Sequence, residues 1–179
     1  MPTIKSSLLF PCIALASFSA FSNALYEAPY VSLGTGPGYV NSMSMNGKHQ
    51  AGLGNWGANL FLGTSVSPYF GPEVGVGYFG LESMGRVGLL GLSARVTGRF
   101  TDRLLLFGKL GAGVGELRTC YLSCTTTSTF VPIIGLGLGW GLNPQWMLST
   151  EFNGAFFPQS TGNGNGVIGG WTIAATRYF

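Results

Sequence analysis

Residues 132–142 read Pro-Ile-Ile-Gly-Leu-Gly-Leu-Gly-Trp-Gly-Leu and give the clearest structural signal in the chain. From Ile134 onward, a bulky apolar residue alternates strictly with glycine. Alternation with a period of two is typical of a β-strand, because successive side chains of a strand point to opposite faces. The stretch therefore predicts a strand with one wide apolar face and one face that carries almost no side chains.

The same alternation recurs along the chain and predicts seven further strands. They are expected at Tyr30–Tyr39, Trp56–Val66, Phe70–Phe79, Leu90–Arg99, Leu104–Val114, Trp146–Asn153 and Trp171–Phe179. The pattern is blurred at Leu105 and Phe107, where both faces would be apolar. With residues 132–142, the prediction is an all-β chain of eight strands.

The predicted connections alternate in length. Tight turns are expected at Ser67–Tyr69, Thr101–Arg103 and Asn143–Gln145, and longer polar loops at Asn41–Leu53, Gly80–Gly88, Glu116–Thr129 and Phe157–Gly166. Short turns at one end and long loops at the other are the pattern of an antiparallel up-and-down transmembrane β-barrel, with the turns periplasmic and the loops extracellular.

Composition favours a membrane barrel over a soluble, lipocalin-like barrel. Charged residues make up only 8% of the chain and the mean hydropathy is +0.34, yet the apolar residues after residue 24 are dispersed rather than gathered in one long run. The face that carries Gly, Ser, Thr and charges suits the narrow lumen of a small barrel. The bulky apolar face is too wide for that lumen, so we expect lipid to cover it.

Residues 1–24 are predicted to be a cleaved signal peptide, which leaves 25–179 as the barrel domain. Lys5 supplies the positive start, an apolar run begins at Leu8, and Ser22-Asn23-Ala24 is a small-x-small cleavage site. When Lys5 is removed with the leader, eight basic and six acidic residues remain. The resulting net charge of +2 gives no reason to expect nucleic acid as a partner.

Two cysteines follow the leader, Cys120 and Cys124, and we expect them to form a disulfide. An exported protein meets an oxidising compartment, which favours the disulfide. Metal binding is the alternative, but it would need further ligands, and the only histidine of the chain is His49. We therefore expect no metal and no cofactor.

The chain resembles the OmpA/OmpX-type family of small eight-stranded outer-membrane β-barrels. The resemblance covers residues 25–179 and is carried by the strand count, the turn and loop alternation, the stretch Pro72–Tyr78 and the terminal Arg177-Tyr178-Phe179. Members often carry an aromatic residue third from the end, where this chain has Arg177. The resemblance implies an outer-membrane location and recognition of the terminal aromatic by the insertion machinery, so Phe179 is expected to act as an assembly signal and as a lipid anchor.

Four charged residues are predicted to face the lumen within the membrane: Glu73, Arg95, Lys109 and Glu151. Two are acidic and two are basic, and they lie at similar distances from the tight turns. Isolated charges in such a place would be costly, so we expect them to pair. The resemblance supports pairing, since such barrels carry Glu–Arg/Lys networks inside. A neutralised core is the main interpretation and an ion gate with exchanging pairs is the alternative.

The function expected from these features is a non-enzymatic, monomeric barrel with a structural or surface-interaction role through its extracellular loops. Its partners would be outer-membrane lipid, lipopolysaccharide, the insertion machinery and a host or surface ligand at the loops. A narrow, low-conductance channel is one alternative. A lipid-modifying enzyme is another, but no catalytic residues are predicted, because it would need a nucleophile and a base facing lipid and the predicted outward faces carry no Asp or Glu.

Overall fold

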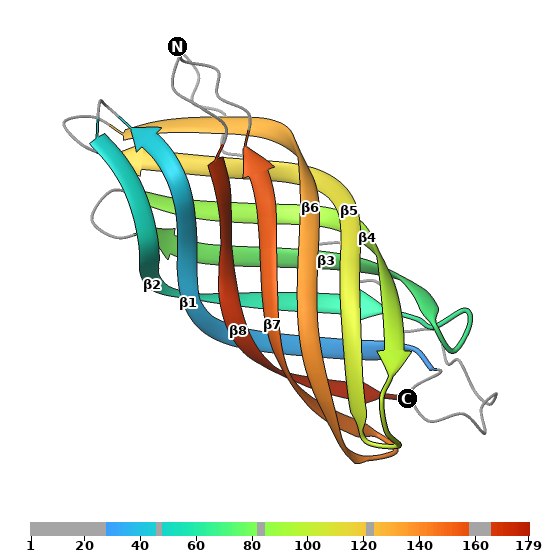
Figure 1. The fold of residues 1–179 in the computed structure, drawn as a ribbon. Coiled ribbons are helices and arrows are strands. Elements are labelled where there is room, and N and C mark those ends of the chain that lie inside the picture. Colours follow the sequence, from blue (N-terminus) through green and yellow to red (C-terminus); the bar gives the residue numbers. More distant parts are fainter. Residues whose placement is uncertain (1–27, 46–47, 82–84, 121–123, 158–165) are drawn as a thin grey trace, which may run out of the picture.

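The computed structural model describes residues 28–45, 48–81, 85–120, 124–157 and 166–179, with the backbone alone for 41–45, 48–52 and 119. Eight antiparallel strands form a closed barrel in which each strand pairs with its neighbours in sequence and the last pairs with the first (Figure 1). The predicted fold class is confirmed. Among the described residues, no helix is long and apolar enough to cross a membrane.

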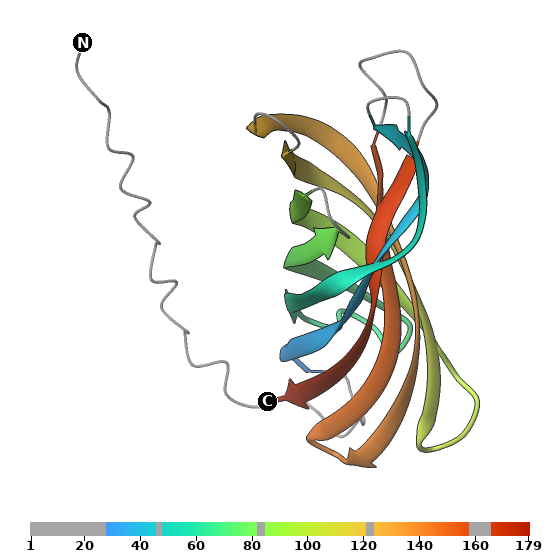
Figure 2. The same ribbon diagram turned by 90° about the vertical axis from the view of Figure 1, so that its left-hand side faces the viewer.

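The strands follow the predicted order. They are β1 (Tyr30–Met45), β2 (Lys48–Gly63), β3 (Phe70–Leu81), β4 (Gly85–Arg99), β5 (Leu104–Cys120), β6 (Cys124–Asn143), β7 (Trp146–Phe157) and β8 (Gly166–Tyr178). They cross the barrel at a slant (Figure 2), as closure of a sheet into a barrel requires.

The three predicted tight turns lie at one end of the barrel, and in each a side-chain oxygen, of Ser67, Thr101 or Asn143, accepts a hydrogen bond from a backbone N–H group. The Asn143 Oδ1 atom accepts hydrogen bonds from the backbone N–H groups of Gln145 and Trp146, both at 2.9 Å. The Thr101 Oγ1 atom accepts one from the N–H of Leu104 at 3.0 Å. Asn and Thr favour turns because they bond the backbone in this way. The C-terminus lies at the same end (Figure 1).

At the opposite end three of the four connections are shorter than predicted, because the strands run further. Phe157–Gly166 is the exception, since β7 ends at Phe157 and β8 begins at Gly166. Most of Asn41–Leu53 belongs to β1 and β2, which reach Met45 and begin at Lys48. Most of Glu116–Thr129 belongs to β5 and β6, which pair without a break to Cys120 and Cys124. Polar, Gly- and Thr-rich composition indicated loops, but backbone pairing between neighbouring strands holds these residues in the sheet.

The outward face is apolar and exposed over the whole height of the barrel. It includes Leu33, Leu60, Leu62, Val74, Val76, Leu90, Leu92, Leu110, Leu136, Leu138, Ile173 and Trp171. Exposed aromatic side chains ring the turn end (Tyr69, Phe70, Phe100, Trp146 and Phe179) and the opposite end (Trp56, Tyr78, Phe130 and Phe156). An apolar band between two aromatic girdles is the surface of a barrel that spans a membrane.

Inward glycines make room for inward aromatic rings on the neighbouring strand. Phe107 lies directly opposite Gly137, and Phe61 directly opposite Gly75. A Cβ atom on Gly137 would lie 2.3 Å from the Phe107 ring, and one on Gly75 would lie 2.2 Å from the Phe61 ring. The alternation of glycine with bulky residues thus lets large rings fill a lumen that is too narrow for side chains from every strand.

Candidate functional site

The four charged residues predicted to face the lumen lie on adjacent or nearby strands and come together. Arg95 of β4 is the direct cross-strand partner of Lys109 of β5. Like charges in that position repel each other. Glu73 of β3 and Glu151 of β7 supply the opposite charges from either side. All four side chains are at most 5% exposed, so the group is a neutral cluster inside the barrel wall.

Three ion pairs join the cluster into one chain. The Lys109 Nζ atom lies 3.0 Å from Glu151 Oε2 and 3.2 Å from Glu73 Oε2. The Arg95 Nη1 atom lies 3.6 Å from Glu73 Oε1. Lys109 is therefore the central residue, because its ammonium group contacts both carboxylates.

Neighbouring hydroxyl and amide groups complete the coordination of the carboxylates. The Tyr30 hydroxyl donates to Glu73 Oε1, and the Ser93 hydroxyl donates to Glu73 Oε2 at 3.4 Å. The Ser149 hydroxyl donates to Glu151 Oε1 at 2.7 Å, and the Asn153 amide donates to Glu151 Oε2 at 3.4 Å. Hydrogen bonds of this kind reduce the cost of burying charge.

Aromatic rings contact the two cations from the sides that the carboxylates leave open. The Arg95 guanidinium lies 3.8 Å from the centre of the Phe107 ring, and the Lys109 ammonium lies 3.7 Å from the centre of the Phe61 ring. Cation–π contacts are stronger where water is excluded. The aromatic–glycine pairs therefore also serve the charge cluster.

Two apolar clusters lie above and below the charges. The cluster at the turn end consists of Tyr30, Leu105, Phe107, Met147 and Tyr178. Leu105 and Phe107, the residues that blurred the strand pattern, are 2% and 1% exposed and point inward.

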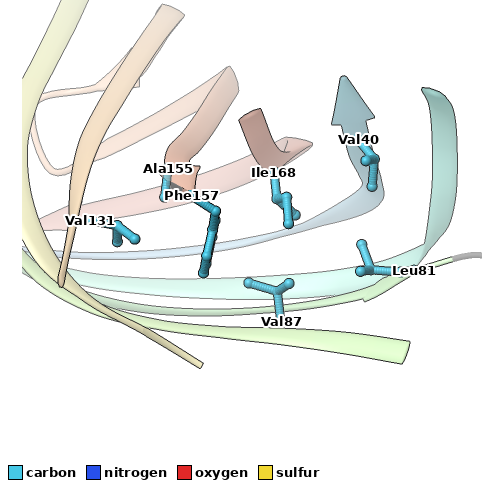
Figure 3. Close-up of a cluster of buried hydrophobic side chains, with 7 residues drawn as sticks. All are labelled: Val40, Leu81, Val87, Val131, Ala155, Phe157 and Ile168. Atoms are coloured by element: carbon cyan, nitrogen blue, oxygen red, sulfur yellow. The ribbon is translucent and has the colours of Figure 1, made fainter. Parts of the chain in front are cut away.

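We call the cluster at the opposite end the apolar plug. It consists of Val40, Leu81, Val87, Val131, Ala155, Phe157 and Ile168. Its side chains converge on the lumen from strands all round the barrel (Figure 3). Val87, Val131, Ala155 and Ile168 are fully buried. An ion that crossed this layer would lose its hydration without gaining polar partners.

A small cavity of about 30 Å³ lies between the charge cluster and the apolar plug, lined among others by Asn59, Phe61, Phe79, Leu89 and Ile133. Such a volume suits one or two water molecules. The Asn59 amide nitrogen donates to the Thr172 hydroxyl at 3.1 Å, while its Oδ1 atom has no hydrogen-bond partner among the described residues. The lumen thus has room for an isolated water rather than for a continuous column.

The two cysteines lie at the far tip of the β5–β6 hairpin and form the predicted disulfide, Cys120–Cys124. Residues 124–128 of β6 are exposed. In the described part of the chain, β7 pairs with β6 only from Ile133 onward. The hairpin therefore extends beyond the apolar band, and β4 accompanies β5 as far as the pair Gly85–Thr119.

Neither a metal centre nor a set of catalytic groups is seen in the parts of the chain that the structure describes. No three His, Cys, Asp or Glu side chains lie close enough there to hold a metal ion. The side chain of His49 lies outside the described residues, as do all of residues 1–24 with the predicted cleavage site. Phe179 is exposed on the outward face at the turn end, 64% accessible.

Sequence reasoning missed several residues of the charge cluster, of which Tyr30 is the most important. Its direction could have been predicted, because the apolar Val31 and Leu33 alternate with Ser32, and Tyr30 lies on the same side of the strand as Ser32. The Phe61 and Phe107 contacts could not be predicted, because they depend on which residues lie opposite each other across the strands.

Comparison with known proteins supports the barrel assignment. A model of the outer membrane protein beta-barrel domain matches residues 8–179. The crystal structure of Neisserial surface protein A superposes with a TM-score of 0.69 at 10% identity, covering 84% of this chain and 97% of that one. The Yersinia pestis attachment invasion locus protein Ail superposes with a TM-score of 0.58 at 18% identity, covering 86% and 99%.

The N-terminal β-barrel domain of Pseudomonas aeruginosa OprF gives a TM-score of 0.59 at 10% identity, covering 86% of this chain and 98% of that one. No curated protein sequence is significantly similar to the chain. At these identities the structural similarity shows the fold, and the activity has to be argued from the residues.

Proposed function

The chain belongs to the outer membrane protein β-barrel family and resides in the outer membrane, and from this we propose that it is a non-enzymatic barrel that makes contacts at the cell surface. The observation that carries the proposal is the β5–β6 hairpin, which extends beyond the lipid-facing band. It is closed by the Cys120–Cys124 disulfide and presents a polar run of Thr and Ser, residues 125–129. A stiff, polar projection on a rigid scaffold suits recognition.

The filled lumen supports a scaffold role over conduction. The charge cluster is neutral and paired, and the apolar plug closes the extracellular half. An enzyme acting on lipid would need a nucleophile and a base on the outward face near the outer leaflet. The expectation that the outward faces carry no Asp or Glu is wrong at Glu116, which is exposed on β5, so lipid chemistry has to be tested directly. Lipid A mass spectra from cells with and without the protein would be the same if the proposal is right.

The ligand class is open, and one structural neighbour suggests a probe. Ail has been crystallised in complex with the heparin analogue sucrose octasulfate. The test compares bacteria that express the wild-type chain with bacteria in which residues 116–129 are replaced by a short Asn-Gly turn. Binding is measured on an array of matrix proteins and sulfated glycans.

We expect at least one array component to bind the wild type and to be lost on shortening the hairpin. Surface amounts are matched by heat-modifiable gel mobility, so that misassembly is not mistaken for loss of binding. Equal binding by both strains would refute the proposal, as would the absence of binding by the wild type to every component.

A further inference from the structure

Two arginines occupy directly opposite positions on the outward face of β4 and β5, at the end of the barrel away from the turns. Arg86 is the cross-strand partner of Arg118. The alternation that buries Val87 and exposes Leu90 directs Arg86 outward, and the pattern that exposes Val114 and Glu116 does the same for Arg118. Cβ atoms of opposite residues lie about 5 Å apart, so two positive charges share one small patch of surface.

Such a pair is unfavourable unless an anion neutralises it. The three ion pairs of the lumen cluster do not involve Arg86 or Arg118. Glu116 lies two residues along β5 on the same face and is exposed. It partly offsets the charge, and the three charged side chains together keep a net positive charge.

The position of the two arginines along the membrane normal indicates which part of the lipid layer surrounds them. Leu90 and Val114, which are direct partners, form the last exposed apolar row below it. Arg86 and Arg118 lie four residues further along their strands, about 14 Å, or roughly 10 Å along the membrane normal at a usual strand tilt. That height falls at the lipid headgroups, beyond the hydrocarbon.

Tyr78 gives an independent marker of the same level. Its ring is 49% exposed on the outward face, where tyrosines favour the boundary between hydrocarbon and headgroups. The Arg86 Nη1 atom donates to the Tyr78 hydroxyl at 3.5 Å, which holds the guanidinium over the interface. Thr126 of β6 is the direct cross-strand partner of Arg118. Tyr78, Arg86, Arg118 and Thr126 therefore lie on the outward face of four neighbouring strands, at or near the headgroup level.

We propose that Arg86 and Arg118, with Tyr78 and Thr126, form a binding site for a phosphate group on the glycolipid of the outer leaflet. Guanidinium groups bind phosphate through paired, charge-assisted hydrogen bonds. A phosphate between the two arginines removes their mutual repulsion. The site anchors one lipid molecule beside the β5–β6 hairpin and does not depend on the surface-contact function proposed above.

The test measures lipid retention by native mass spectrometry after reconstitution into phosphatidylcholine vesicles that contain lipid A. We expect the wild type to retain bis-phosphorylated lipid A about tenfold better than R86A/R118A, since losing two charged hydrogen bonds has an effect of that order. Dephosphorylated lipid A should be retained equally by both proteins. R86K/R118K keeps the charge but loses the paired geometry and should fall between them.

The matched control is R99A/R103A, which removes two exposed arginines at the turn end. Heat-modifiable mobility establishes that each variant is folded. Equal retention by the wild type and R86A/R118A would overturn the site, and so would an equally large loss in R99A/R103A. If excess inorganic phosphate displaced the lipid, the site would bind soluble anions and its assignment to lipid would be wrong.

Discussion

Lys109 is the residue on which the lumen depends most, because it is the only cation of the cluster that contacts both carboxylates at 3.2 Å or less. Its ammonium group also faces the Phe61 ring, and its side chain is buried. Removing it leaves two buried carboxylates that share the single remaining cation, Arg95. Single substitutions can test both this charge balance around Lys109 and the close fit of inward glycines against aromatic rings.

Lys109→Met should lower the free energy of unfolding in micelles by about 3–5 kcal/mol, because it leaves an uncompensated buried charge. The measurement is the urea midpoint followed by heat-modifiable gel mobility. Arg103→Met, at an exposed turn position, is the control and should change the free energy by no more than about 0.5 kcal/mol. Equal midpoints for the two variants would show that the ion pairs do not stabilise the barrel.

Gly137→Ala should destabilise by about 1–3 kcal/mol, because the new methyl group meets the buried Phe107 ring and forces it out of place. Gly88→Ala is the matched control, since a Cβ atom there has nothing within 4 Å. Urea midpoints of the two variants are compared in the same micelles. A Gly137→Ala protein as stable as Gly88→Ala would mean that the aromatic–glycine fit is loose.

At the scale of elements, the β5–β6 hairpin behaves differently from the rest of the sheet. Within the membrane both strands are fixed by neighbours on either side. Beyond Ile133, β6 is paired by β5 alone among the described residues, out to Cys124. β5 itself remains paired with β4 as far as Thr119, so β6 is the edge strand of this extension among the described residues. The disulfide joins that edge to β5 at the tip.

Replacing both cysteines, C120S/C124S, should leave the unfolding midpoint of the barrel nearly unchanged and make the hairpin sensitive to protease. The disulfide closes a loop of a few residues, for which chain entropy gives about 2 kcal/mol. That amount applies to fraying of the hairpin and not to opening of the barrel. Limited proteolysis with peptide mass mapping measures this fraying. A wild-type sample whose disulfide has been reduced is treated in the same way for comparison. Resistance equal to that of the oxidised wild type would show that strand pairing alone holds the tip.

The strands could be predicted from sequence where one of their faces contacts lipid, but not where backbone pairing alone holds them in the sheet. In the membrane, side-chain alternation gave the order of strands and the inward direction of residues such as Glu73 and Glu151. At Leu105 and Phe107 it failed, because an apolar lumen makes both faces alike. Beyond the membrane neither face of a strand has to be apolar, so the polar composition of residues 124–129 predicted a loop although they pair with β5.

Considered as a whole molecule, the barrel is a solid cylinder rather than a tube. Its lumen contains an apolar cluster at the turn end, a neutral cluster of charges, a cavity of about 30 Å³ and the apolar plug. Water can occupy the cavity, but on the side away from the turns the apolar plug offers no polar partners among the described side chains.

Purified protein in planar bilayers should therefore show no stepwise conductance under an applied potential. The physical reason is the cost of moving an ion through a layer without water or polar groups. A larger, water-filled porin in the same chamber serves as the positive control. Reproducible unit steps from the wild-type protein would support the channel alternative.

Deleting Phe179 should reduce insertion in cells more than spontaneous folding into micelles. The proposed assembly signal is read by the insertion machinery only in cells, whereas the exposed ring contributes little packing inside the protein. Outer-membrane fractions and micelle refolding yields are compared for the truncated and full chains. If the truncated chain reached the outer membrane at wild-type levels, Phe179 would be only one member of the aromatic girdle.

The pairing of β1 with β8 also sets the order in which the molecule can be built. Tyr30 lies opposite Tyr178, so the seam joins residues from the two ends of the barrel domain. Contacts so distant in sequence form slowly, because the chain between them must first be gathered. Until the seam closes, the first and last strands are both open edges that could pair with another chain. The protein is therefore most prone to aggregate before β1 and β8 have paired. An assembly factor would lower this risk by shortening that period.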